Sequence, residues 1–179
     1  MLHAFVNPRD KLSYHHYYAQ FLIAAGRTGE AETILANMER NLGESPYGKL
    51  GVAYIRGFLA RSENKPEEAI EYFKEAAAVA PLYPVRYMLG RLYLETGRYD
   101  YAVSTFEKLL LDFDDKRLNW SIWDDKADYY LARAYEETDN YSEAARHYRV
   151  FLEIFKEADT DIPELADARE RLQVLDRRP

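Results

Sequence analysis

The sequence contains no cysteine, and this absence excludes disulfide bonds and thiolate metal sites. A reducing compartment is therefore permitted. No stretch approaches the roughly 18 apolar residues that a membrane-spanning helix requires. The first residues also lack the charged and then apolar pattern of a secretory signal peptide. We therefore expect a cytoplasmic protein with no membrane insertion.

Positive charge is also scarce. The chain has 24 lysine and arginine residues against 31 aspartate and glutamate residues, so its net charge is −7. Proteins that bind nucleic acid need a basic face, and the sequence therefore predicts no nucleic-acid partner. Hydrophobic residues make up 47% of the chain, which is enough for a folded core.

Signatures of catalysis and of metal binding are missing as well. The four histidines, His3, His15, His16 and His147, form no HExxH motif and no set at metal-ligand spacing. The sequence has no glycine-rich phosphate loop and no HRD or DFG sequence. Neighbouring carboxylates such as Glu67 and Glu68 stand at predicted helix starts, where they interact favourably with the helix dipole. We predict no enzyme activity, no metal and no cofactor.

One stretch, LGRLYLETGRYDYAVSTFEKL at residues 89–109, contains the pattern that explains the rest of the chain. Its first leucine and Tyr93 lie four residues apart, on one face of a helix. Ala102 and Phe106 have the same spacing on a second helix. Gly97 stands between them, where a residue that tolerates the left-handed conformation is needed. The stretch therefore predicts a helix–turn–helix unit.

The same pattern recurs along the chain. Four alanines mark the second helix of each unit, Ala31, Ala69, Ala102 and Ala144, at separations of 38, 33 and 42 residues. We predict helix pairs over about residues 9–43, 47–81, 83–113 and 124–158. A further amphipathic segment, residues 162–177, is expected to form a helix that caps the array. No strand-like alternation appears, so the predicted fold is all-α.

This pattern resembles the tetratricopeptide repeat (TPR), a unit of 34 residues that forms a helix pair. The resemblance implies a right-handed α-solenoid of about four repeats plus a C-terminal capping helix, forming a single domain over residues 1–179. It also implies a scaffold for protein–protein interaction. The C-terminal third, with Tyr129-Tyr130-Leu131 and Arg169-Glu170-Arg171-Leu172, is similar to the C-terminal repeats of bacterial multidomain kinase and regulator proteins.

In TPR arrays the first helix of each pair lines a concave groove, and the resemblance places ten residues there. They are His16, Gln20, Tyr54, Phe58, Arg61, Tyr87, Arg91, Lys126, Tyr129 and Arg133. Aromatic rings and basic groups alternate in this set, and Tyr and Arg are frequent in binding hot spots. Because arginine can hold a carboxylate with two hydrogen bonds, we predict a peptide or partner segment with acidic and apolar groups as the ligand.

Two other interpretations stay open at the level of sequence. In the first, the groove binds nothing: the tyrosines only pack against the neighbouring repeat, and the arginines pair with Glu95 or Glu136. Separately, the linker between the third and fourth repeats contains Trp120 and Trp123. These rings either fill the joint or bind a partner or a second copy, which would make a homodimer. The alternative function is therefore a structural or oligomerisation spacer, or the regulatory tail of a larger bacterial signalling protein.

Overall fold

The computed structural model describes residues 15–42, 44–112, 126–157 and 162–177. These residues form α-helices joined by short turns, and none of them lies in a strand. The predicted all-α fold is confirmed. No helix in these ranges is both long and apolar enough to cross a membrane. Backbone contacts divide the chain into two compact units, Met1–Val85 and Arg86–Pro179, and each is described by itself. That the whole array forms one domain stays a prediction.

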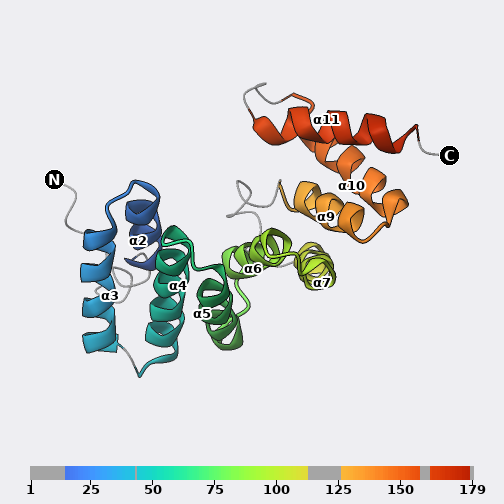
Figure 1. Cartoon of the computed structure of the whole chain (residues 1–179). Coiled ribbons are helices and arrows are strands. Elements are labelled where there is room, and N and C mark those ends of the chain that lie inside the picture. Colours follow the sequence, from blue (N-terminus) through green and yellow to red (C-terminus); the bar gives the residue numbers. More distant parts are fainter. Residues whose placement is uncertain (1–14, 43, 113–125, 158–161, 178–179) are drawn as a thin grey trace. The chain divides into compact units, whose positions relative to one another are not determined.

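Unit 1 consists of two antiparallel helix pairs (Figure 1). Its helices are α2 (His15–Ala24), α3 (Thr28–Leu42), α4 (Pro46–Ser62) and α5 (Pro66–Val79). Within the first pair α2 packs against α3, within the second α4 packs against α5, and α4 also packs against both helices of the first pair.

Local sequence explains where these helices begin and end. Ser45 accepts a hydrogen bond from the backbone N–H of Gly48 at 2.9 Å, which caps α4. Pro46 follows in the first turn, where its missing N–H leaves no bond unmade. The turns after α2 and α4 need a left-handed residue, and Gly26 (φ 74°) and Asn64 (φ 60°) provide it.

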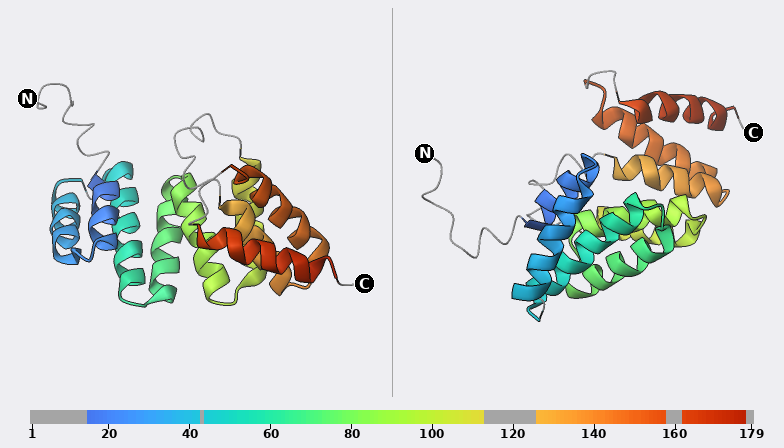
Figure 2. Two further views of the ribbon diagram at one scale, coloured as in Figure 1. Left: turned by 90° about the horizontal axis from the view of Figure 1, so that it is seen from above. Right: turned by 60° about the vertical axis from the view of Figure 1, so that its left-hand side comes forward.

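Unit 2 begins within α6 and contains the remaining helices. They are α6 (Tyr83–Glu95), α7 (Tyr99–Leu111), α9 (Ala127–Glu137), α10 (Tyr141–Ile154) and α11 (Pro163–Leu175). Figure 2 shows α11, in red, beside α10, and the two helices pack together. Gly97 (φ 73°) and Asp139 (φ 58°) form the two left-handed turns of this unit. The helix pairs and the terminal helix therefore follow the pattern expected from the sequence.

Small residues let the two helices of a pair cross closely. A Cβ atom added to Gly90 of α6 would lie 2.7 Å from the ring of Phe106 on α7. In unit 1 a Cβ on Gly57 would lie 2.9 Å from the ring of Phe73. Both phenylalanine rings are fully buried. The repeated small residue is therefore the place where the aromatic ring of the second helix sits.

Candidate functional site

The structure places the predicted groove residues on the first helices of the repeats, but most of their rings are deeply buried. His16 is 3% exposed, Tyr54 1%, Phe58 8%, Tyr87 2% and Tyr129 5%. Their aromatic faces belong to the cores of the two units. What a ligand could reach is therefore the polar groups around these rings, and those groups differ between the units.

In unit 1 the predicted residues form a packed cluster of rings and hydrogen bonds. The hydroxyl of Tyr54 donates to the side-chain oxygen of Gln20. Nδ1 of His16 lies 3.0 Å from the hydroxyl of Tyr47, and its ring centroid lies 5.1 Å from that of Tyr54. Burial, and secondarily the neighbouring His15, lowers the pKa of His16 to about 4. The imidazole is therefore neutral at neutral pH. Arg61 lies half-buried at the end of α4.

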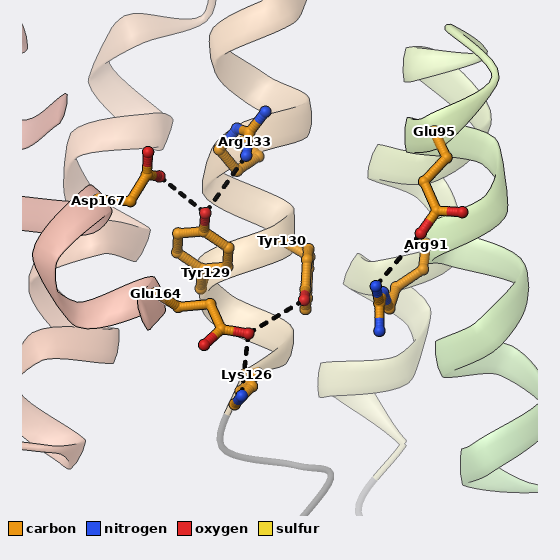
Figure 3. A network of polar contacts seen from close by, with 8 residues as sticks. All are labelled: Arg91, Glu95, Lys126, Tyr129, Tyr130, Arg133, Glu164 and Asp167. Atoms are coloured by element: carbon orange, nitrogen blue, oxygen red, sulfur yellow. Dashed lines mark hydrogen bonds and ion pairs between the residues drawn. The ribbon is translucent and has the colours of Figure 1, made fainter. Parts of the chain in front are cut away.

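In unit 2, Arg91 of α6 lies against the tyrosines of α9. Its guanidinium carbon is 4.8 Å from the ring centroid of Tyr130, and its Nη2 donates to Glu95 at 3.2 Å. Tyr87 meets the same ring edge to face, with centroids 5.8 Å apart. The Nε atom of Arg91 is buried and has no acceptor. The cation is thus held in position by a ring and one carboxylate, with one donor left unused (Figure 3).

Arg133, one turn beyond Tyr129 on α9, has a similar surrounding. Its Nη1 donates to the hydroxyl of Tyr129 at 3.3 Å, and that hydroxyl donates to Asp167 of α11 at 2.7 Å. The Nε atom of Arg133 is buried without an acceptor. Within the described part of the chain, no carboxylate lies within ion-pair distance of Arg133. Arg133 is therefore a positioned cation that donates to the hydroxyl of Tyr129 and acts on the more distant carboxylate of Asp167 through its charge alone.

The terminal helix α11 lies on the side of α9 opposite to α6 (Figure 3). Glu164 accepts from Lys126 at 2.9 Å and from the hydroxyl of Tyr130 at 3.3 Å. Although burial acts to raise it, these hydrogen bonds hold the pKa of Glu164 below its usual value. Lys126 is consequently engaged within the chain, and α11 supplies the acidic partner (Figure 3).

A second set of contacts joins α11 to α9 and α10. Arg171 donates to Asp167 at 2.7 Å and to Glu136 at 3.1 Å, and Glu136 also accepts from Tyr148 at 2.9 Å. Burial acts to raise the pKa of Asp167, but hydrogen bonds from Tyr129 and Arg171 keep it below its usual value. Asp167 is therefore ionised at neutral pH, and its contacts together with those of Glu136 hold α11 against α9 and α10.

The pairing of Arg91 with Glu95, one of the open interpretations of the sequence, is confirmed. Glu136 pairs with Arg171 rather than with a groove arginine. Sequence reasoning missed the role of Tyr130 and of the α11 groups. A usable signal existed, because Glu164, Asp167 and Arg171 stand at intervals of three and four residues, on one face of the capping helix. Trp120 and Trp123 lie outside the described residues.

Other polar clusters offer no alternative centre in the described ranges. No group of three or more His, Asp and Glu side chains is arranged to hold a metal ion there. The buried pair of His147 and Asp128, with Nδ1 2.6 Å from Oδ1, joins α10 to α9 and stacks under Tyr135. His147 also lies 2.6 Å from the guanidinium of Arg146, and the pair holds the two helices together.

Comparison with known proteins identifies the repeat. Three family models described as tetratricopeptide repeat match residues 12–37, 60–122 and 126–158. A solved structure of a MamA RS-1 ArsTM double mutant is 15% identical, with a TM-score of 0.58, and the match covers 94% of this chain and 96% of that one. A putative kinesin light chain from Podosopora anserina with TPR-like repeats is 17% identical over 92% of this chain and 85% of that one, with a TM-score of 0.60. Identities this low show the fold alone. No curated protein sequence matches.

Proposed function

We propose that this chain, an array of tetratricopeptide repeats, binds an acidic, partly apolar segment of a partner protein through Arg91 and Arg133 of unit 2. The observation that supports this is the pair of buried guanidinium Nε atoms that have no acceptor. A buried donor without a partner costs about 1–3 kcal/mol. A ligand carboxylate that displaces the groups covering these atoms and accepts from them would remove that cost, and this gain would add to the binding free energy.

The surroundings of both arginines favour this use. The ring of Tyr130 holds Arg91, and the hydroxyl of Tyr129 holds Arg133, so neither side chain loses much freedom when a ligand arrives. Arg91 keeps 26% of its side chain exposed, although its Nε atom is buried. The planar guanidinium matches the two oxygens of a carboxylate. Tyr87, Tyr129 and Lys126 act in this proposal as supports for the arginines.

Unit 1 contains the other predicted groove residues, and they do not form the binding centre that we propose. Gln20 and Arg61 are half-buried, and Gln20 accepts a hydrogen bond from the buried Tyr54. Since neither set of residues contains a catalytic arrangement, we infer that the chain works as a binding partner and not as a catalyst.

The second candidate is a structural or oligomerisation spacer, and the burial of the five groove rings favours it. In that case Trp120 or Trp123 would make the partner or homodimer contact. A place as regulatory tail of a larger bacterial, cytoplasmic signalling protein rests on the resemblance of the C-terminal third alone.

A peptide array tests the proposal directly. Peptides of one length would carry increasing numbers of aspartate and glutamate beside leucine and phenylalanine, and binding of the labelled protein would be read on each spot. We expect binding to rise with acidic content and to fall for Arg91→Ala and Arg133→Ala. Arg169→Ala, which removes the same charge from an exposed position on α11, should leave it unchanged. If none of the three substitutions changed binding, the result would favour the structural or oligomerisation spacer.

A further inference from the structure

Helix α2 presents two large aromatic side chains to solvent. Tyr18 is 50% exposed and Phe21 is 61% exposed. Their rings lie parallel, with an interplanar angle of 13° and centroids 6.5 Å apart. Neighbouring apolar side chains that stay exposed can mark a site of interaction with another molecule. We call these two residues the α2 patch.

The other repeats show what normally happens at these positions. Counting from the small residue of each first helix, Phe21 corresponds to Leu59, Leu92 and Ala134. Those three residues are 9%, 0% and 0% exposed. The position of Tyr18 is held by Leu89 and Leu131 in the third and fourth repeats, and these are 6% and 1% exposed. In the second repeat it is held by Arg56, which is exposed but donates to Glu39 of the preceding helix α3. The two residues of the α2 patch therefore occupy positions that pack against other parts of the chain in later repeats, but in α2 they are exposed to solvent.

Within each unit, a helix of the preceding repeat packs against the first helix of the next. In unit 1, α3 packs against α4, and Arg56 donates to Glu39 at 2.8 Å. In unit 2, α7 packs against α9, and Tyr135 donates to Glu107. Among the described residues, no helix precedes α2 to take this role. The α2 patch therefore lies on the face of a first helix where the preceding repeat packs in the rest of the chain.

The last helix of the chain has the opposite character. Leu165, Ala168 and Leu175 are buried on the inner side of α11. Its outer side presents Arg169, Glu170 and Gln173, which are exposed and polar, together with one large apolar side chain, Val174, which is 50% exposed. A polar outer face prevents further stacking on the end of a repeat array. Head-to-tail growth, in which the α2 patch of one copy sits on the last helix of another, would therefore meet a mainly polar surface.

The charge of α2 permits a symmetric contact. Its sequence, HHYYAQFLIA, contains no aspartate, glutamate, lysine or arginine. Two copies of a chain with a net charge of −7 repel each other overall. They can meet at α2 without placing like charges opposite one another.

We propose that the α2 patch is the contact surface of a homodimer, in which Tyr18 and Phe21 of one copy pack against the same residues of a second copy. A two-fold contact of this kind uses one patch twice and closes the assembly at two copies. Two side chains cannot supply the roughly 800 Å² per partner of a standard interface. The dimer is therefore reversible and forms as concentration rises.

The mass of the protein in solution, measured by sedimentation over a wide range of concentrations, tests this. Wild type should pass from monomer to dimer as concentration rises, and Phe21→Glu should stay a monomer throughout. Tyr101→Glu is the matched control, because Tyr101 is a 65% exposed aromatic residue on α7, and this variant should dimerise like wild type. A wild-type monomer at every concentration overturns the proposal, as does a dimer that Phe21→Glu leaves intact, which would place the contact elsewhere. A melting temperature that falls in a monomeric Phe21→Glu would show that the patch is covered within one chain.

Because the chain has no cysteine, single cysteines can locate the contact. Ala25 follows Phe21 by one helical turn, with its backbone N–H bonded to the carbonyl of Phe21 at 3.0 Å, and it is exposed. Ala25→Cys should form an intermolecular disulfide under mild oxidation, several-fold faster than Ala166→Cys at a position on α11 that is also exposed. Equal rates for the two variants would contradict a contact at α2.

Discussion

At the scale of single residues, the small position in each first helix sets how closely a helix pair can approach. Gly90→Ala would place a methyl group within 2.9 Å of three ring atoms of Phe106. Alanine gains about 1 kcal/mol over glycine in a helix, but overpacking a tight core costs about 1–3 kcal/mol. We expect a net loss of stability, measured as the free energy of unfolding in urea.

Gly29→Ala is the control for this change. Gly29 also lies in a helix, near the start of α3, but nothing lies within 4 Å of an added Cβ. We expect it to leave stability unchanged or to raise it by up to about 1 kcal/mol. If Gly90→Ala were as stable as Gly29→Ala, the close crossing would not limit the repeat.

His16 makes the stability of the protein depend on pH. Burial lowers its pKa from 6.5 to about 4, so the unfolded chain takes up a proton at mildly acidic pH while the folded chain does not. Stability should therefore fall as pH drops from about 6.5 to about 4, and this part of the loss should end below that range. Between about pH 7.5 and 5.5 we expect His16 to contribute a loss of about 1 kcal/mol.

The measurement is the free energy of unfolding at the two pH values in wild type and His16→Gln. The variant lacks the titrating group, so its free energy of unfolding should fall by about 1 kcal/mol less than that of wild type between the two pH values. Equal pH dependence in the two proteins would mean that His16 is not buried as a neutral ring.

At the scale of elements, α11 stabilises unit 2 through both apolar and polar contacts. Leu165 is 2% exposed on its inner side, and cutting a buried leucine back to alanine costs about 2–5 kcal/mol. Val174 is 50% exposed on the same helix, so Val174→Ala should change stability by less than about 0.5 kcal/mol. Similar effects of the two changes, measured by thermal unfolding, would show that α11 does not pack as described.

The helices could be predicted because small and apolar residues recur at helical spacing, which indicates the buried face of each helix. How deeply each side chain is buried could not be predicted. Tyr54 and Tyr87 were placed on the correct helices, but periodicity alone does not tell which neighbour covers a ring or leaves it open. The contacts of Glu164 with Lys126 and Tyr130 depend on how α11 sits on α9. That docking joins residues 34 and 38 positions apart, beyond the reach of a local pattern.

At the scale of the whole molecule, the charge balance decides which partners are favoured. A chain with a net charge of −7 repels acidic partners from most of its surface, so a cationic site must act at short range. Binding of an acidic segment should therefore weaken as salt concentration rises. If salt left the affinity unchanged, the contact would be mainly apolar, and Arg91 and Arg133 would not be its centre.

The most direct test of the central claim is a calorimetric titration of the best-binding acidic peptide into wild type, the double variant Arg91→Ala/Arg133→Ala and the control Arg169→Ala. Loss of two charge-assisted contacts predicts an affinity at least about tenfold lower for the double variant, equal to about 1.4 kcal/mol. The control should bind like wild type. An affinity of the double variant equal to that of wild type would contradict a binding site at Arg91 and Arg133.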